Sequence, residues 1–123
     1  MLAARLATDQ SRPLVAGLAL ITGAITAALS AAALLIGPWR DGLDPTTHVY
    51  PAIVWVLGGW CAAHLLLGMV AALYCVARGL AGRLSARHDG DLWNATLFAH
   101  FTVPTVLVTL GVIHLFPASG AGP

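Results

Sequence analysis

The sequence predicts an all-α integral membrane protein with three transmembrane helices. Two observations predict it: 9% of the 123 residues are charged and 59% are hydrophobic, and the charges are clustered. Residues 13–39, 45–77 and 92–123 contain no Asp, Glu, Lys or Arg. An ordinary soluble domain carries about 25% charged residues, so a soluble enzyme, a disordered tail and a basic nucleic-acid-binding protein are excluded. We expect a single membrane domain over residues 1–123.

Each uncharged stretch is long enough to cross a membrane once. A helix needs about 20 apolar residues to span about 30 Å of hydrocarbon, and three segments cannot close a β-barrel, so the spans must be helices. We expect them at residues 14–36, 50–77 and 93–116. Pro13 and Pro51 suit first-turn positions, where a missing N–H costs little. The run Gly37-Pro38-Trp39-Arg40 predicts a turn at the membrane edge, and the first span is too long for the core of a signal peptide.

The arginines predict the orientation, because the chain contains no lysine. Arg40 lies alone in the loop after the first span. The others precede the first span or lie between the second and third: Arg5, Arg12, Arg78, Arg83 and Arg87. Loops rich in positive charge stay in the cytoplasm, so we expect an up-down-up topology with a cytoplasmic N-terminus. The lysine-free, alanine-rich composition indicates a bacterial source and therefore the bacterial inner membrane.

Small and hydroxylic residues predict how the helices pack. In the first span, hydroxyls recur at a four-residue interval beside a row of small residues: Thr22, Thr26 and Ser30, and Gly23, Ala27 and Ala31. Such rows allow close helix contact, and we expect the hydroxyls to donate hydrogen bonds across the seam. The second span offers glycines at 58, 59 and 68 and tryptophans at 55 and 60. A lipid or cofactor groove is the alternative interpretation, and further helices from a partner are expected.

Histidines are the candidates for chemistry, because no carboxylate lies inside any predicted span. Counting along antiparallel helices places His64 and His100 at similar depth, and His48 and His114 near the outer surface. Opposed imidazoles can hold a haem iron, while the alternatives are structural histidines, a proton relay or a partner contact. Pro104 is expected to bend the third span and free a nearby carbonyl.

The remaining polar groups predict structure rather than catalysis. Cys61 and Cys75 lie about 21 Å apart along one helix, which is too far for a disulfide, so both are expected to pack. Asp91 is expected to cap the third span by accepting from its first N–H groups. No metalloprotease, Cys-x-x-Cys or phosphate-loop motif is present in the sequence.

Two runs together resemble subunit III of the haem–copper oxidases. The first begins at Tyr50, continues through Trp60-Cys61-Ala62-Ala63-His64 and Leu67-Gly68, and ends in Tyr74-Cys75-Val76-Ala77-Arg78; it is similar to the penultimate helix of that family. The second, Arg87-His88 followed by Leu97-Phe98-Ala99-His100-Phe101, is similar to the last helix. The resemblance covers residues 50–116 and is greatest to the C-terminal part of bacterial fusions of subunits I and III. Subunit III has seven helices, and it carries an acidic residue at the entrance to its last helix, where this chain has Trp93.

The resemblance implies an accessory role without catalytic residues on this chain. Subunit III binds neither haem nor copper, which reside in subunit I; it packs beside subunit I and other oxidase subunits, holds phospholipids and supports proton uptake during cytochrome c oxidation. The residues implied in helix packing, lipid binding or subunit contact are Trp55, Trp60, His64, Gly68, Trp93 and His100. Two alternatives stay open: a bis-histidine haem b protein of quinone-linked electron transfer, ligated by His64 and His100, and a structural membrane protein unrelated to respiration.

Overall fold

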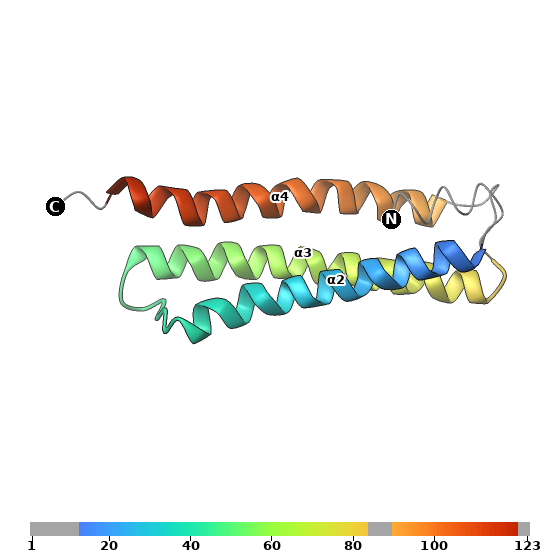
Figure 1. The fold of residues 1–123 in the computed structure, drawn as a ribbon, viewed down its shortest axis with the longest axis horizontal. Helices are drawn as coiled ribbons and strands as arrows, with labels where there is room; N and C mark the ends of the chain where they lie inside the picture. The colour runs from blue at the N-terminus through green and yellow to red at the C-terminus, as the bar shows by residue number, and fades with distance from the viewer. Residues whose placement is uncertain (1–12, 84–89, 121–123) are drawn as a thin grey trace.

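The computed structural model describes residues 13–83 and 90–120, which form three long helices (Figure 1). They are α2 at Pro13–Arg40, α3 at Val49–Leu80 and α4 at Gly90–Gly120. Each is long and apolar enough to cross a membrane. The predictions of an all-helical fold and of a multi-pass membrane protein are thereby confirmed. Arg5, Arg12, Arg87 and His88, on which the predicted orientation and the resemblance partly depend, lie outside the described residues.

Successive helices run in opposite directions, and α3 lies beside both of its neighbours (Figure 1). The core is built mainly of small side chains, which let the helix axes approach closely. Its buried members come from all three helices: Ala16, Leu20 and Ala24 of α2, Ala72 and Cys75 of α3, and Leu92 and Ala95 of α4. Gly58 marks the approach of α3 to α2, since a Cβ there would lie 3.4 Å from the carbonyl oxygen of Leu34.

Each helix is longer than predicted at both ends, and the turn predicted at residues 37–40 is wrong. α2 continues through Pro38 to Arg40, because a proline in the last turn removes only its own N–H bond to Leu34. The chain leaves the helix after Arg40, where Gly42, with φ of 66°, permits a Schellman motif in which Leu43 N–H donates to Pro38 O. α3 ends in the same way at Gly82, with φ of 67°.

The Thr22 and Thr26 hydroxyls do not donate across the helix seam, contrary to prediction. Thr22 and Thr26 are exposed, and they donate to carbonyls of their own helix at Leu18 and Thr22, over 2.9 and 2.8 Å. The buried face of α2 is turned slightly away from them, along Ala16, Leu20 and Ala24. A threonine in a helix can satisfy its own donor on the carbonyl four residues back, so these hydroxyls need no partner helix.

The loop between α2 and α3 is held by its own polar groups and by one tryptophan. The Asp44 carboxylate accepts from the Thr46 N–H and hydroxyl, and these bonds lower the pKa of Asp44 below its ordinary value. They therefore contribute while Asp44 is ionised and are lost as the pH falls through that lowered pKa. Trp55 Nε1 donates to Leu43 O over 2.7 Å, which fixes the loop on the first turns of α3.

Candidate functional site

His64 lies in an aromatic cluster where α3 meets α4. The His64 cluster consists of His64 and Trp60 of α3 and Phe98 and Phe101 of α4. The imidazole centroid is 4.5 Å from the ring of Trp60, 6.0 Å from Phe98, with which it is stacked, and 6.4 Å from Phe101. Gly68 borders the cluster, because a Cβ there would lie 3.7 Å from Phe98, at an ordinary van der Waals distance. His64 is at the midpoint of the 32-residue α3, so the cluster joins the two helices at mid-span.

The three histidines within the helices share one hydrogen-bonding pattern. Nδ1 of His64, His100 and His114 lies 2.9, 2.8 and 2.8 Å from the carbonyl oxygen four residues earlier. A carbonyl oxygen only accepts, so Nδ1 must carry the proton and donate. In the neutral imidazole the other ring nitrogen, Nε2, is then an acceptor with a lone pair. All three rings are fixed against their own helix backbone, and each presents an acceptor at its tip.

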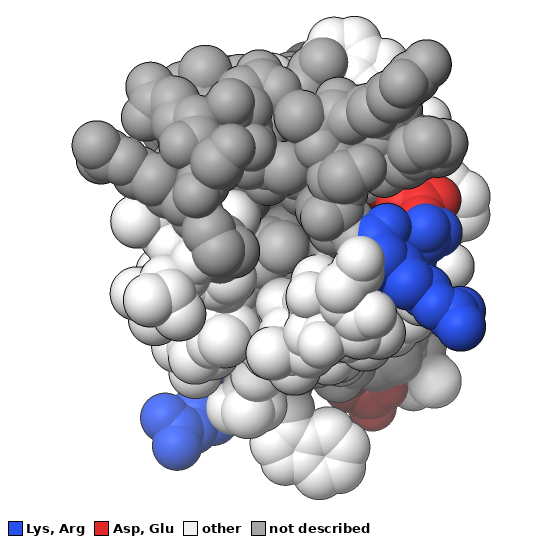
Figure 2. All heavy atoms as spheres, turned by 90° about the vertical axis from the view of Figure 1, so that its right-hand side faces the viewer, with Lys and Arg blue, Asp and Glu red and all other residues white. Residues whose placement is uncertain are grey.

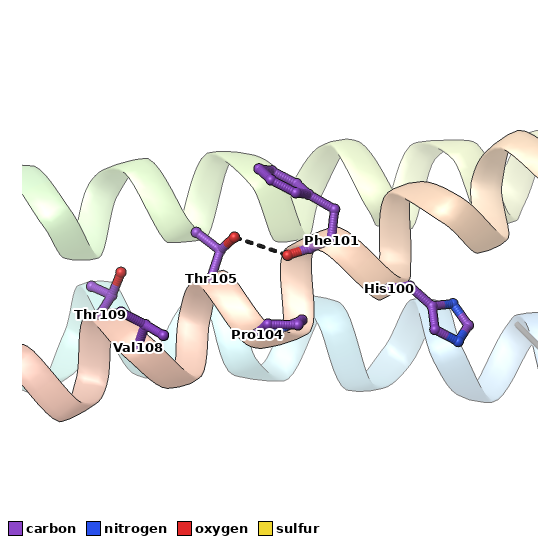
Figure 3. A pocket seen from close by; sticks show the side chains of 6 residues that line it. All are labelled: His100, Phe101, Pro104, Thr105, Val108 and Thr109. Carbon is purple, nitrogen blue, oxygen red and sulfur yellow. Dashed lines mark hydrogen bonds between the residues drawn. The ribbon is translucent and has the colours of Figure 1, made fainter.

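His100 is exposed and borders a shallow hollow on the outer face of α4. The hollow has a volume of about 460 Å³. All the residues that line it belong to α4, and we call it the Pro104 hollow: His100, Phe101, Pro104, Thr105, Val108 and Thr109 (Figure 3). α4 continues as one helix through Pro104, which has no N–H to donate to the carbonyl of His100. The Thr105 hydroxyl donates to Phe101 O over 2.8 Å.

His64 and His100 do not meet within the described part of the chain. His64 contacts Phe101 and Phe98, whereas the His100 and Phe101 side chains leave α4 in different directions (Figure 3). His48 and His114, the second predicted pair, are both exposed. Among the contacts of residues 13–83 and 90–115, neither contacts the other. The arrangement does not place His64 and His100 on opposite faces of one haem.

Tyr50 joins the start of α3 to the C-terminal part of α4. Its hydroxyl donates to the carbonyl oxygen of Ile113 over 3.2 Å. That carbonyl would receive the N–H of residue 117 in a regular helix, but residue 117 is proline and has none to give. Because an unsatisfied carbonyl is costly in a membrane, the tyrosine supplies the bond that Pro117 removes.

An ion pair joins the other ends of the same two helices. Arg78 Nη1 donates to the Asp91 carboxylate, Nη2 donates to Arg83 O over 3.3 Å, and the guanidinium lies 6.0 Å from the centroid of the Tyr74 ring. Figure 2 looks onto this end, where blue and red side chains meet at one edge. Asp91 was predicted to cap α4 as its N-cap; that prediction is wrong, because Asp91 lies inside the first turn and its carboxylate pairs with Arg78.

The remaining predicted residues lie in distinct settings. Trp55 is half-buried against the loop, whereas Trp60 and Trp93 are exposed by 60% and 44%. Cys61 and Cys75 are free and buried, which confirms that they pack in the core. Trp60 and His64 therefore belong to the His64 cluster, which Gly68 borders at Phe98, while Trp55, Trp93 and His100 lie elsewhere.

The site arranges helix contacts rather than reacting groups. Within residues 13–83 and 90–120, no three His, Cys, Asp or Glu side chains lie close enough to hold a metal ion. The His64 ring is packed among carbon rings, and its Nδ1 proton is committed to Trp60 O. Held in this way, the ring fills space between α3 and α4.

The helix contacts made by Phe98, Phe101, Tyr50 and Ile113 were not predicted, although the first three residues stand in the runs that carry the resemblance. For Tyr50 a signal existed, since Pro117 follows Ile113 by one helical turn and must leave that carbonyl without its usual donor. For Phe98 and Phe101 no signal existed, because apolar residues surround α4 on all sides. Comparison with known proteins finds no matching protein family, curated protein or solved structure.

Proposed function

We propose that this chain is an accessory, non-catalytic subunit of a bacterial haem–copper terminal oxidase, similar to the C-terminal part of subunit III. It packs against subunit I, binds phospholipids and supports proton uptake and cytochrome c oxidase activity, while haem and copper stay in subunit I. The observation that carries the proposal is the His64 cluster, in which the histidine of the Trp60–His64–Gly68 pattern forms a helix contact. The assignment to an oxidase depends on the resemblance over residues 50–116.

The large uncovered apolar surface supports a role inside a larger assembly. Between 17% and 22% of the most apolar window of each helix is buried, and large side chains are exposed on all three helices, such as Leu29, Trp60 and Val108. Lipid tails can cover such a surface, and so can helices of a partner. A chain of this kind would add helix surface to a complex.

Co-purification tests the proposal most directly. A tagged full-length chain, extracted from its native membrane in a mild detergent, is expected to bring down subunit I together with its haem absorbance and copper. Peptide mass spectrometry identifies the partner, and size-exclusion chromatography shows whether the chain is folded. A monodisperse, helical chain that brings down no haem–copper subunit I would contradict the proposal.

Haem absorbance of the isolated chain distinguishes the haem b alternative from the oxidase proposal. One observation favours that alternative: Nδ1 of His64 and of His100 contacts a backbone carbonyl, which leaves Nε2 as the nitrogen that could ligate haem iron. The chain purified away from other subunits is expected to show no Soret band. A Soret band that disappears in both His64→Ala and His100→Ala would establish the alternative instead.

We further propose an up-down-up topology in the inner membrane with the N-terminus in the cytoplasm. The alternating helix directions (Figure 1) are compatible with this arrangement, and the distribution of arginines supports its orientation. Alkaline phosphatase fused after residue 123 is expected to be active, and green fluorescent protein fused there to be dark. A variant with Arg83→Gln, Arg87→Gln, Thr46→Arg and Thr47→Arg moves two positive charges from the second loop to the first. Part of its population is expected to insert in the inverted orientation, which lowers the phosphatase activity. A fluorescent, phosphatase-inactive C-terminus in the unmodified chain would refute the orientation.

A further inference from the structure

His100 places polar atoms near the middle of the membrane on the outer face of α4. It follows Gly90 by ten residues, or about 15 Å, in a candidate span of 26 residues that ends at Leu115. The side chain is exposed, and the described part of the chain gives its Nε2 no hydrogen-bond donor. Hydrocarbon offers no donor either, so an exposed acceptor at this depth is costly unless another molecule supplies one.

The backbone adds a second acceptor at the same level. Pro104 cannot donate to the carbonyl of His100, so this oxygen lacks the bond that a regular helix would give it. Pro104 and His100 both line the Pro104 hollow, and Figure 3 shows α4 in front of the ribbons of α3 and α2. Two acceptors therefore lie beside one depression, on a face of α4 that neither α3 nor α2 covers.

The exposed face of α2 differs in this respect. Its Thr22 and Thr26 hydroxyls are exposed too, but each donates to a carbonyl of its own helix. Their donors are satisfied without a neighbour, so this face of α2 is suited to lipid. Unsatisfied acceptors at membrane depth therefore distinguish the exposed face of α4 from the exposed face of α2.

We propose that the Pro104 hollow of α4 seats a transmembrane helix of a different polypeptide, which donates a hydrogen bond to His100. The donor is a side-chain hydroxyl, amide or indole N–H, and the hollow admits the side chain that carries it. A second copy of this chain, meeting the first through the same face, would oppose acceptor to acceptor and leave both unsatisfied. The inference rests on the proposed function, because it assigns the face through which an accessory subunit meets its complex.

Site-specific photo-crosslinking in the native membrane tests which face is covered. A photoreactive benzophenone amino acid replaces Val108 in the Pro104 hollow or, as the matched control, Leu29 on α2; both native side chains are exposed by 67%. Position 108 is expected to give an adduct that maps to a transmembrane helix of another polypeptide, and position 29 is expected to give none. An adduct with a second copy of this chain, an adduct from position 29 alone, or no protein adduct from either position would overturn the proposal.

Two substitutions of His100 test the hydrogen bond itself. His100→Leu removes the acceptor, whereas His100→Gln places an amide oxygen near the position of Nε2. Since hydrogen bonds between membrane helices are of modest strength, the adduct from position 108 and the co-purified partner are expected to fall about three- to tenfold in His100→Leu and to recover in His100→Gln. Circular dichroism checks that both variants stay helical. Equal yields in all three proteins would show that His100 accepts no bond from the partner.

The outcomes separate this inference from the proposed function. If the adduct at position 108 depends on His100 but comes from a protein unrelated to the oxidase, the docking face stands and the oxidase assignment fails. If subunit I co-purifies while position 29 alone gives adducts, the oxidase assignment stands and the docking face fails.

Discussion

Replacing Ala72 with leucine is expected to destabilise the packing of the three helices strongly. Ala72 is fully buried, with an exposed fraction of 0%, and it belongs to the core that joins α2, α3 and α4. Three added carbon atoms have no space there, and overpacking of a close-packed interior costs about 1–3 kcal/mol. The midpoint of thermal unfolding in detergent, followed by circular dichroism, should fall accordingly.

Ala63→Leu is the matched control, because it makes the same chemical change on the same helix. Ala63 is exposed, so the larger side chain extends into lipid or detergent and the free energy of unfolding should be almost unchanged. Equal destabilisation by the two substitutions would mean that the Ala72 contact is not part of the folded core.

Removing the Tyr50 hydroxyl is expected to have the second-largest effect. In Tyr50→Phe the carbonyl of Ile113 loses its donor, and Pro117 cannot replace it. An unsatisfied buried acceptor costs about 1–3 kcal/mol. The variant should therefore unfold at a lower temperature, and its α3 and α4 should separate more readily at the end that carries Tyr50.

A second substitution tells this cause apart from a simple loss of packing. Pro117→Ala restores an N–H that can reach Ile113 O, so Tyr50→Phe should be nearly neutral in that background. The double-mutant cycle of Tyr50→Phe and Pro117→Ala is expected to give a coupling of about 1 kcal/mol. If Tyr50→Phe costs the same in both backgrounds, the hydroxyl does not compensate for the proline.

The number of helices and their approximate extents could be predicted from the sequence, because the positions of the charged residues can be read directly along the chain. An uncharged stretch must be long enough to cross the hydrocarbon and must end where ionised groups reach water. The spans predicted at 14–36, 50–77 and 93–116 therefore fall inside α2, α3 and α4. The ends were missed by several residues, because Pro38 is tolerated in a last turn and Gly42 and Gly82 decide where the turns begin.

The side chains that meet one another could not be predicted in the same way. Soluble helices reveal their buried face by alternating with polar residues, but a membrane helix is apolar all round, and α4 shows no preferred apolar side. Depth along the helix therefore suggested that His64 and His100 were a pair. Rotation about the helix axis separates them, with His64 against Phe98 and His100 beside Pro104.

From the sequence it was possible to predict three membrane-spanning helices, the helix ends at which the arginines lie, and similar depths for His64 and His100. The packed helices were needed to show that His64 joins α3 to α4, that His100 faces outward, and that Tyr50 satisfies the carbonyl left by Pro117. Hydrophobicity determines how far a segment extends through lipid. Contacts between helices depend instead on the rotation of each helix about its own axis, and close packing and individual hydrogen bonds determine that rotation.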